Sequence, residues 1–329
     1  MLPHRLTWRS LAASKGWYDP ESGTPFRFCD AYCPSDPLLR RICDARVWSV
    51  YRRAAPSQLF TADYIRSKPG AKPYPLAITP DKRLSVADVF ALIRDHYEGT
   101  EFDMTRGVDA GPYGAPLRWR PLKWKVDGVD YAWDRPISTQ QTAFSSLTQS
   151  RARLPDPIGG LLWFGMDDSY TTCYVPFYCG IDAVAKSFTA GSIERYSPES
   201  AWWVFNLAAN YANLKYSFMV PELQAAQKDI ESTLLALQPA VEKTAVDLAA
   251  ADPSLMTRYL TDYSAMHAES TVGRWRALTE HLITRYNDGY IRNEQGTHTE
   301  VGYPEGWLRR VIKERPEQYR LPAEKAARE

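Results

Sequence analysis

The sequence predicts an α+β protein in which a β-rich middle precedes a long helical C-terminal part. Residues 122–126 and 129–133 alternate apolar and polar side chains around Asp127-Gly128, a dipeptide typical of two-residue hairpin turns. From about residue 197 onward, apolar residues instead recur every three or four positions, which indicates amphipathic helices. The change of period divides the chain into regions of different structure.

The first 80 residues are rich in proline and predict packed loops, with one helix within 40–53. A clearer helix follows. Ser85 is a good N-cap, Asp88 lies in the first turn, and Gly99 is positioned to end the helix. Its buried face is predicted to consist of Val86, Val89, Phe90 and Ile93.

Besides the hairpin, three strands are predicted at 141–149, 159–166 and 170–178, the last two separated by a turn at 167–169. These segments, with the helix after Ser85, form a predicted region at 81–196. The region before it is 1–80, and a helical extension occupies 197–329.

The extension is predicted to begin with Ser197 as N-cap and Pro198 at the first helical position. A long helix follows that Pro239 is expected to kink or split, and Asp252-Pro253 opens another. Two long amphipathic helices joined by a tight turn predict an antiparallel helical hairpin. A charged tail follows Pro322.

Composition excludes several partners. The 329 residues carry 40 basic and 39 acidic side chains, and this net charge of +1 offers no electrostatic attraction for nucleic acid or an anionic membrane. No apolar run is long enough for a transmembrane helix, and the N-terminus lacks the apolar stretch of a signal peptide. The location stays open: cytoplasmic if Met1 is the true start, secreted or periplasmic if an upstream leader is missing.

No chemical motif identifies a function. Basic residues interleaved with tryptophans could form a nucleic-acid patch, but their alternation favours the solvated face of the hairpin: Arg118, Arg120, Lys123 and Lys125, with Trp119 and Trp124. Asp167-Asp168 is either a carboxylate pair or an ordinary turn. No metal site is predicted, because the histidines are isolated and are expected as caps or helix-surface residues: His96, His267 and His281.

The cysteine number is odd, so at least one thiol is free if disulfides form. The expected state is small, buried, apolar thiols at positions 29, 33, 43, 173 and 179. Cys29 and Cys33 are four residues apart, but nothing completes a zinc set with them.

Longer segments resemble the bacterial cysteine dipeptidases of the N-terminal-nucleophile hydrolases, the family related to dipeptidase A. They follow the family order with similar spacing over nearly the whole chain. The segments are Arg41-Ile-Cys-Asp-Ala-Arg-Val-Trp-Ser49, Asp95-His-Tyr-Glu-Gly-Thr100, Arg135-Pro-Ile-Ser-Thr-Gln-Gln141, Leu154-Pro-Asp-Pro-Ile-Gly-Gly-Leu-Leu-Trp163, Ala201-Trp-Trp-Val-Phe-Asn206, Arg258-Tyr-Leu-Thr-Asp-Tyr-Ser264 and Gly302-Tyr-Pro-Glu305.

The resemblance implies a four-layer αββα sandwich that hydrolyses dipeptides and other short peptides without a metal or organic cofactor. It also implies a nucleophilic cysteine at the N-terminus of the mature chain. A free α-amino group has a reference pKa of about 7.7–8.0, so the amine of that same residue acts as the general base for the thiol.

The resemblance places this chain beyond the nucleophile. Cys29, Cys33 and Cys43 lie in segments far past it, and an internal cysteine has no free amine. The resemblance therefore implies the C-terminal portion of the enzyme: an incomplete sandwich that retains the later antiparallel strands and has no catalytic residue of its own.

The later strands of related enzymes line one side of the pocket. This implies a substrate wall at Thr139, Gln140 and Gln141, just before the strand predicted at 141–149. The alternative is that these are strand-end residues that satisfy backbone groups.

Three hypotheses follow. The leading one is a truncated or split dipeptidase, inactive alone, whose partners are short peptides and the missing N-terminal segment. A second is a non-catalytic module of the same fold that binds peptides or proteins. A third is a cysteine hydrolase in which Cys29 or Cys43 works with His96.

Overall fold

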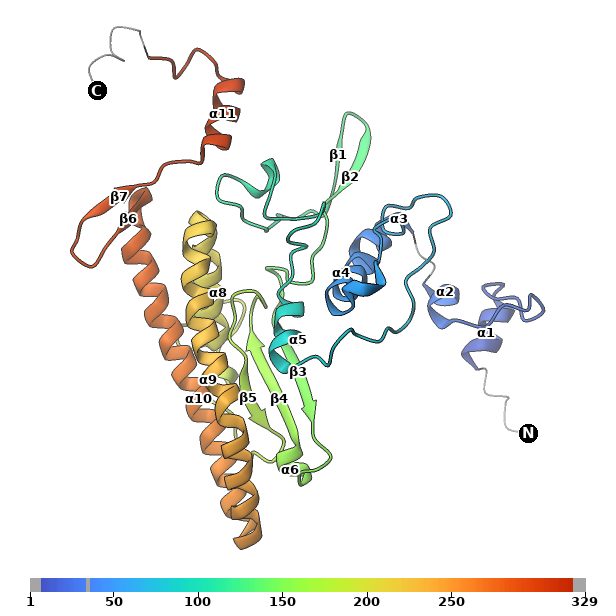
Figure 1. The fold of residues 1–329 in the computed structure, drawn as a ribbon, viewed down its shortest axis with the longest axis vertical. Coiled ribbons are helices and arrows are strands. Elements are labelled where there is room, and N and C mark those ends of the chain that lie inside the picture. Colours follow the sequence, from blue (N-terminus) through green and yellow to red (C-terminus); the bar gives the residue numbers. More distant parts are fainter. Residues whose placement is uncertain (1–6, 34–35, 322–329) are drawn as a thin grey trace. The chain divides into compact units, whose positions relative to one another are not determined.

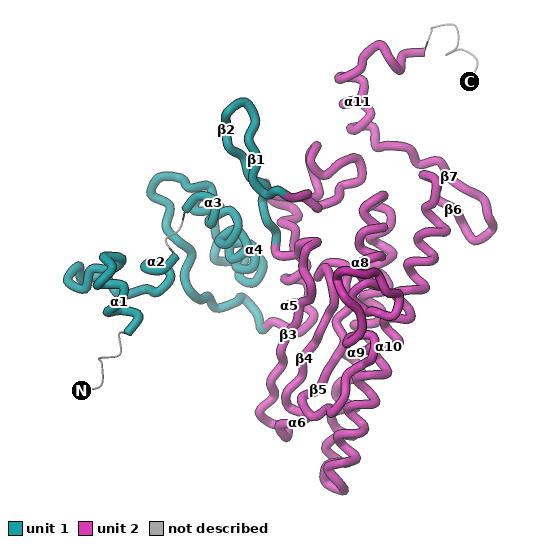
Figure 2. Tube along the Cα trace, turned by 180° about the vertical axis from the view of Figure 1, so that it is seen from behind, with its two compact units in different colours: residues 1–83, 121–136 teal, residues 84–120, 137–329 magenta. Residues whose placement is uncertain are grey.

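The computed structural model describes residues 7–33 and 36–321, so the predicted charged tail and the N-terminal six residues lie outside the described part. The chain divides into two compact units (Figure 2). Unit 1 comprises Met1–Arg83 and Pro121–Pro136, and unit 2 comprises Leu84–Arg120 and Ile137–Glu329. Helices and small antiparallel sheets are both present, which confirms the α+β class. The described helices are all too short or too polar to cross a membrane.

Unit 1 contains more helix than the proline content predicts. The helix expected within 40–53 is present as α4, and Trp48 anchors it by burying its ring and donating from Nε1 to the carbonyl of Phe60 at 2.9 Å. The other helical elements are α1 (Trp8–Ser14), α2 (Phe28–Tyr32), α3 (Pro37–Leu39), a π-helical turn (Arg40–Asp44), α4 (Ala45–Ala54) and a 3-10 turn (Pro56–Gln58).

The predicted hairpin is confirmed. Strands β1 (Lys123–Val126) and β2 (Val129–Ala132) pair antiparallel, and Val126 faces Val129 across the turn. Both turn residues are left-handed, with φ of 49° at Asp127 and 79° at Gly128, as a two-residue turn of this type requires.

Unit 2 is built on a three-stranded antiparallel sheet with strand order β3-β4-β5, beside which two long helices run (Figure 1). Its elements are α5 (Val86–Ile93), a 3-10 turn (Val108–Ala110), β3 (Phe144–Ser150), α6 (Asp156–Gly159), β4 (Gly160–Met166), β5 (Val175–Tyr178), α7 (Lys186–Thr189), α8 (Ala201–Ala212), a 3-10 turn (Asn213–Lys215), α9 (Tyr216–Ala251), α10 (Pro253–Tyr286), a 3-10 turn (Asn287–Gly289), β6 (Tyr290–Arg292), β7 (His298–Glu300) and α11 (Glu305–Glu314).

The start of α5 is as predicted, but its end is not. Ser85 and Asp88 form a capping box, in which each side chain accepts from the other residue's backbone N–H. The helix ends at Ile93 rather than near Gly99. Beyond it, carboxylates take up the backbone amides: Asp95 accepts from Tyr97 N at 3.2 Å, and Glu98 accepts from His96 N at 2.7 Å.

The helical hairpin is confirmed, since α9 and α10 pack against each other and only Asp252 separates them (Figure 1). Asp252 caps α10 by accepting from Ser254 N at 2.8 Å. The predicted split at Pro239 is wrong, because α9 continues through it. Leu234 and Val241, on either side of the proline, are buried, and this packing outweighs the hydrogen bond that proline removes.

The first helix of the extension begins later than predicted. Ser197 forms a turn instead of a cap: its Oγ accepts from Glu199 N and its carbonyl from Ser200 N. Ser200 takes the N-cap position, and α8 begins at Ala201.

The two faces of the sheet differ in burial. On one face Trp163 is fully buried and makes an edge-to-face contact with Phe90 of α5, and Phe90 in turn stacks on Tyr174 at 4.3 Å. On the other face Leu162, Phe164 and Met166 are only partly buried. One face of the sheet therefore lies in the core, and the other remains partly uncovered by the described residues.

A buried ion pair joins α5 to α9. Arg94 forms two hydrogen bonds to Glu231, at 2.9 and 2.5 Å, and also donates to the carbonyls of Ser169 and Thr172. Glu231 in turn accepts from Tyr174 N at 2.9 Å. Burial alone would lower the pKa of Arg94, but Glu231 raises it above its ordinary value, so the guanidinium stays charged.

Replacing Glu231 by Gln should therefore destabilise the fold by about 3 kcal/mol or more, because the Arg94 charge would stay buried without a counter-charge. The control is Asp229→Asn. Asp229 lies half a turn from Glu231 on α9, and its exposed ion pair with Arg274 of α10 should contribute under about 1 kcal/mol. Chemical denaturation measures both. Equal losses in the two variants would contradict the role given to the buried pair.

Candidate functional site

The predicted wall residues lie in a tight turn at the end of the sheet. Thr142 N donates to the carbonyl of Thr139 at 3.0 Å, and the two hydroxyls are 3.2 Å apart. Thr139 is buried within this turn. Gln140 donates from Nε2 to the carbonyl of Arg118 at 2.8 Å, so its amide has a structural partner. Strand β3 begins at Phe144, three residues later than predicted.

Beside this turn is a cavity of about 400 Å³, which we name the α8 pocket. Gln140 and Gln141 line it, whereas Thr139 does not. None of its lining residues carries a charge. They are Gln140, Gln141, Thr142, Ala143, Ala190, Gly191, Ser192, Ile193, Ser200, Trp202 and Trp203.

Another part of the lining comes from the first turn of α8 and the loop before it. Trp203 donates from Nε1 to the carbonyl of Ser192 at 2.8 Å, which fixes the loop at 190–193. Gly191 has φ of +107°, and a Cβ there would lie 2.6 Å from Ser200 Oγ. Glycine at 191 thus lets the loop approach the first turn of α8 closely. Sequence reasoning missed this part of the lining, because Trp202 and Trp203 read as bulk for a helix.

The Asp167-Asp168 turn is buried, unlike an ordinary surface turn. Asp168 accepts from Ser138 Oγ at 2.7 Å and Tyr170 N at 3.1 Å. Asp167 has φ of 68° and accepts from Asn206 on α8 through Oδ1, while its Oδ2 has no partner among the described residues. Burial raises the pKa of Asp167 to about 7. A protonated Oδ2 fits these surroundings.

The prediction that His96 is a cap or helix-surface residue is wrong. His96 is almost fully buried, lies 3.2 Å from Glu98 through Nδ1, and packs on Tyr170 with ring centroids 4.5 Å apart. The local carboxylates that end α5 bring this residue inside. On the helix surface, as predicted, His281 contacts Glu222 at 3.0 Å. Within residues 7–33 and 36–321, no group of three His, Cys, Asp or Glu side chains is arranged for a metal ion.

The alternation predicted that Arg118 lies on a solvated basic face, and this prediction is wrong. Arg118 is buried, forms an ion pair with Asp109, and donates to the carbonyls of Met104, Ala115 and Leu117. Arg118 therefore organises the loop before the hairpin. The lysines of the hairpin, Lys123 and Lys125, are exposed as predicted.

Four cysteines contradict the expectation of buried thiols: Cys29, Cys33, Cys43 and Cys179 are exposed. Short helices and turns bring the first three to the surface of unit 1. Cys173 alone is buried as expected, and burial raises the pKa of its thiol well above the ordinary value. All five thiols are free.

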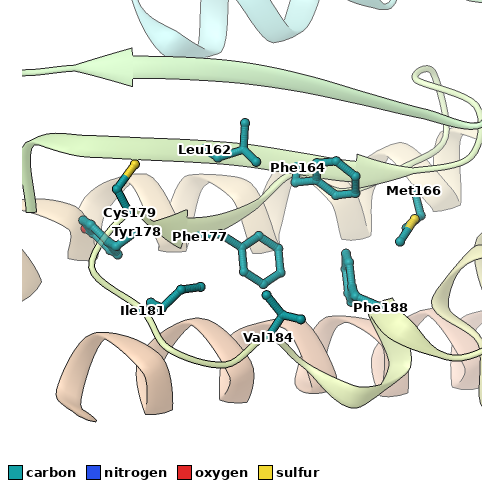
Figure 3. A pocket seen from close by; sticks show the side chains of 9 residues that line it. All are labelled: Leu162, Phe164, Met166, Phe177, Tyr178, Cys179, Ile181, Val184 and Phe188. Atoms are coloured by element: carbon teal, nitrogen blue, oxygen red, sulfur yellow. The ribbon is translucent and has the colours of Figure 1, made fainter. Parts of the chain in front are cut away.

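A second cavity of about 400 Å³ lies on the partly uncovered face of the sheet (Figure 3). Figure 3 shows Phe164 of β4 and Phe177 of β5 opposite Val184 and Phe188 of the segment that follows β5. The remaining lining residues are Leu162, Met166, Tyr178, Cys179 and Ile181. Nearby, Phe144 stacks on Phe164 at 5.3 Å and is 58% exposed. We call this surface the open apolar face.

The Asp167 carboxyl should make stability fall as the pH rises. Its pKa is raised above the ordinary 3.8, so between about pH 4 and pH 7 the folded chain holds a proton that the unfolded chain has released. Asp167→Asn removes this titration and should gain stability relative to the unchanged chain, on the order of a few kcal/mol, between pH 4 and pH 8.

The control for that measurement is Asp252→Asn. The Ser254 amide lowers the pKa of Asp252. The stability that the Asp252 carboxylate contributes is therefore lost as the pH falls below about 4. Across pH 4–8 the unfolding free energy of Asp252→Asn should therefore run parallel to that of the unchanged chain, whereas that of Asp167→Asn should diverge from it. Parallel curves for the Asp167→Asn variant and the unchanged chain would contradict the buried, protonated carboxyl.

The open apolar face should make the purified chain bind a hydrophobic dye and self-associate. Replacing Phe144 and Phe164 together by Ser should lower both effects. Met266→Ser is the control, because Met266 is also 58% exposed but lies on α10. Dye fluorescence and light scattering measure the outcome. A monomer that binds no dye would show that this face is not available.

Comparisons with known proteins identify the family of this chain. The model of peptidase family C69 matches residues 7–229, more than half of the chain. A probable dipeptidase of Salmonella dublin is 30% identical over 186 residues, which cover 56% of this chain and 37% of that protein. Probable dipeptidase B of Streptococcus pyogenes serotype M1 is 23% identical over 214 residues, which cover 64% of this chain and 40% of that protein.

A probable dipeptidase of Latilactobacillus sakei is 23% identical over 171 residues, covering 52% of this chain and 31% of that protein. The chain thus spans about two fifths or less of the length of these curated relatives. The family model covers more than half of the chain, including the three-stranded sheet β3-β4-β5, and the chain belongs to peptidase family C69.

Proposed function

We propose that this chain forms part of a dipeptidase and supplies one wall of its substrate pocket. The observation that carries the proposal is the match to peptidase family C69 over residues 7–229. The relatives named as probable dipeptidases add to it. Dipeptides and other short peptides are therefore the proposed substrates.

The α8 pocket is the proposed substrate wall. Its volume of about 400 Å³ lies within the range of small-molecule sites, and it combines aromatic side chains with a few polar groups. Gln140 and Gln141, for which the family resemblance implies a place in the substrate wall, both line this pocket. Thr139 contributes indirectly, by closing the turn that carries the two glutamines.

The nucleophile is proposed to come from a segment outside these 329 residues. An N-terminal cysteine carries a thiol and an amine on one residue, so it needs no separate base. Cys173 is unsuited to this role, since burial raises its pKa and keeps the thiol protonated. Cys29 and Cys43 belong to unit 1 and His96 to unit 2, and the pairing of one of these cysteines with His96 stays a separate prediction.

The proposed fold of the complete enzyme is the αββα sandwich. The open apolar face supports it, because sheet faces of this kind are normally buried against another layer. In the sandwich, strands of the other segment would cover Phe144 and Phe164. The two proposals fit together: one segment brings both the nucleophile and the missing layer.

The chain alone should not hydrolyse dipeptides above the rate in buffer, because no thiol in it is paired with a terminal amine. Adding a separately expressed N-terminal segment that begins with the family cysteine should produce turnover. The control is the same segment with that cysteine changed to Ala. Release of amino acids from a dipeptide panel is the measurement.

Two other outcomes of this assay are informative. Robust turnover by the 329-residue chain alone, abolished by a cysteine-directed alkylator, would contradict the split enzyme. A mixture that forms a complex without turnover would favour the alternative, a non-catalytic peptide- or protein-binding module. The open apolar face is the observation that favours that alternative.

A further inference from the structure

We propose that the N-terminus of α8 binds the terminal carboxylate of a short peptide in the α8 pocket. The inference rests on the proposed function for the identity of the ligand as a short peptide. It assigns that ligand an orientation, with its C-terminal carboxylate at α8 and the neighbouring side chain against the tryptophans. It also explains why an uncharged pocket would accept an anion.

The first turn of α8 has free backbone donors. The first bond within the helix runs from Val204 N to the carbonyl of Ser200, so the amides of Ala201, Trp202 and Trp203 precede the hydrogen-bonded ladder. None of these three amides has an acceptor among the residues that the structure describes. No acidic residue lies in the first turn to neutralise the helix dipole. Such a terminus, on a helix of 12 residues, attracts a carboxylate.

Ser200 is the second, independent observation. It is the N-cap residue and is only 3% exposed, yet its side chain makes no cap hydrogen bond. A serine at this position normally accepts from the second or third amide of the helix. Here its hydroxyl has no partner among the described residues, and the residue lines the pocket. The hydroxyl is therefore available at the pocket wall and could donate a hydrogen bond to a ligand oxygen there.

The other walls suit the rest of a dipeptide. Trp202 and Trp203 pack edge to face at 4.6 Å and, with Ile193, offer apolar surface for a side chain. Gln141 also lines the pocket and carries both an amide donor and an acceptor for the peptide group. The lining offers no cation for an acidic side chain, so the proposed ligands are dipeptides with a neutral, apolar C-terminal residue.

The test compares two ligands that differ only in the carboxylate: N-acetyl-alanyl-leucine and its C-terminal amide. Binding to the 329-residue chain is followed by tryptophan fluorescence and by the backbone amide resonances of Trp202 and Trp203. The acid should bind at least tenfold more tightly than the amide and should shift both resonances. Equal binding of the two ligands, or binding of neither, would overturn the proposal.

Variants of Ser200 sharpen the test. Ser200→Asp places a carboxylate over the same amides, so it should retain or raise the thermal stability while weakening binding of the acid at least tenfold. Ser200→Ala removes only the hydroxyl and should weaken binding of the acid about threefold to tenfold. The control is Ser232→Asp, an exposed serine on α9, which should bind as the unchanged chain does.

Undiminished binding by folded Ser200→Asp would overturn the proposal. If Ser200→Asp does not fold, the ligand pair and the two amide resonances of the unchanged chain decide the question. All readouts measure binding, so they are independent of turnover. A chain that binds the acid selectively while the mixture with the N-terminal segment stays inactive would support this inference and contradict only the dipeptidase proposal.

Discussion

The buried pair between Arg94 and Glu231 connects parts of unit 2 that are 137 residues apart in the sequence. Arg94 also holds the carbonyls of Ser169 and Thr172, and Glu231 holds the amide of Tyr174. One pair thus orders the segment between β4 and β5 and ties it to α5 and α9. Two charges this deep in a protein are tolerated only because these hydrogen bonds satisfy nearly all of their donors and acceptors.

The candidate site depends on that ordered segment. Asp167 in the same turn bonds Asn206, which orients α8, and the first turn of α8 forms one wall of the pocket. The Thr139–Thr142 turn supplies another part of the lining and is joined to the same segment through Ser138 and Asp168. The pocket therefore sits where several chain segments meet at one end of a sheet, and buried hydrogen bonds hold the turn and the helix on which part of its lining stands.

The two cavities of unit 2 have different chemistry and suit different partners. The α8 pocket combines amides, a free hydroxyl and tryptophans, as expected for a small polar ligand. The open apolar face is lined by phenylalanine and aliphatic side chains, as expected for a surface that another protein layer covers. A chain that spans two fifths or less of its relatives accounts for both features under the proposed function.

By itself the sequence determined the elements that depend on local physics: the Asp127-Gly128 hairpin, the Ser85 capping box and the Asp252 cap of α10. Through the family resemblance it also predicted a substrate wall at Gln140 and Gln141; both line the α8 pocket, and their role stays a prediction. Only the tertiary structure decided that α9 continues through Pro239, that Arg118 and His96 are buried, and that α8 begins after Ser200 rather than after Ser197. The path through Pro239 depends on the burial of Leu234 and Val241, and the burial of His96 on its packing against Tyr170; such contacts between residues distant in sequence outweigh local preference and leave no periodic trace in the chain.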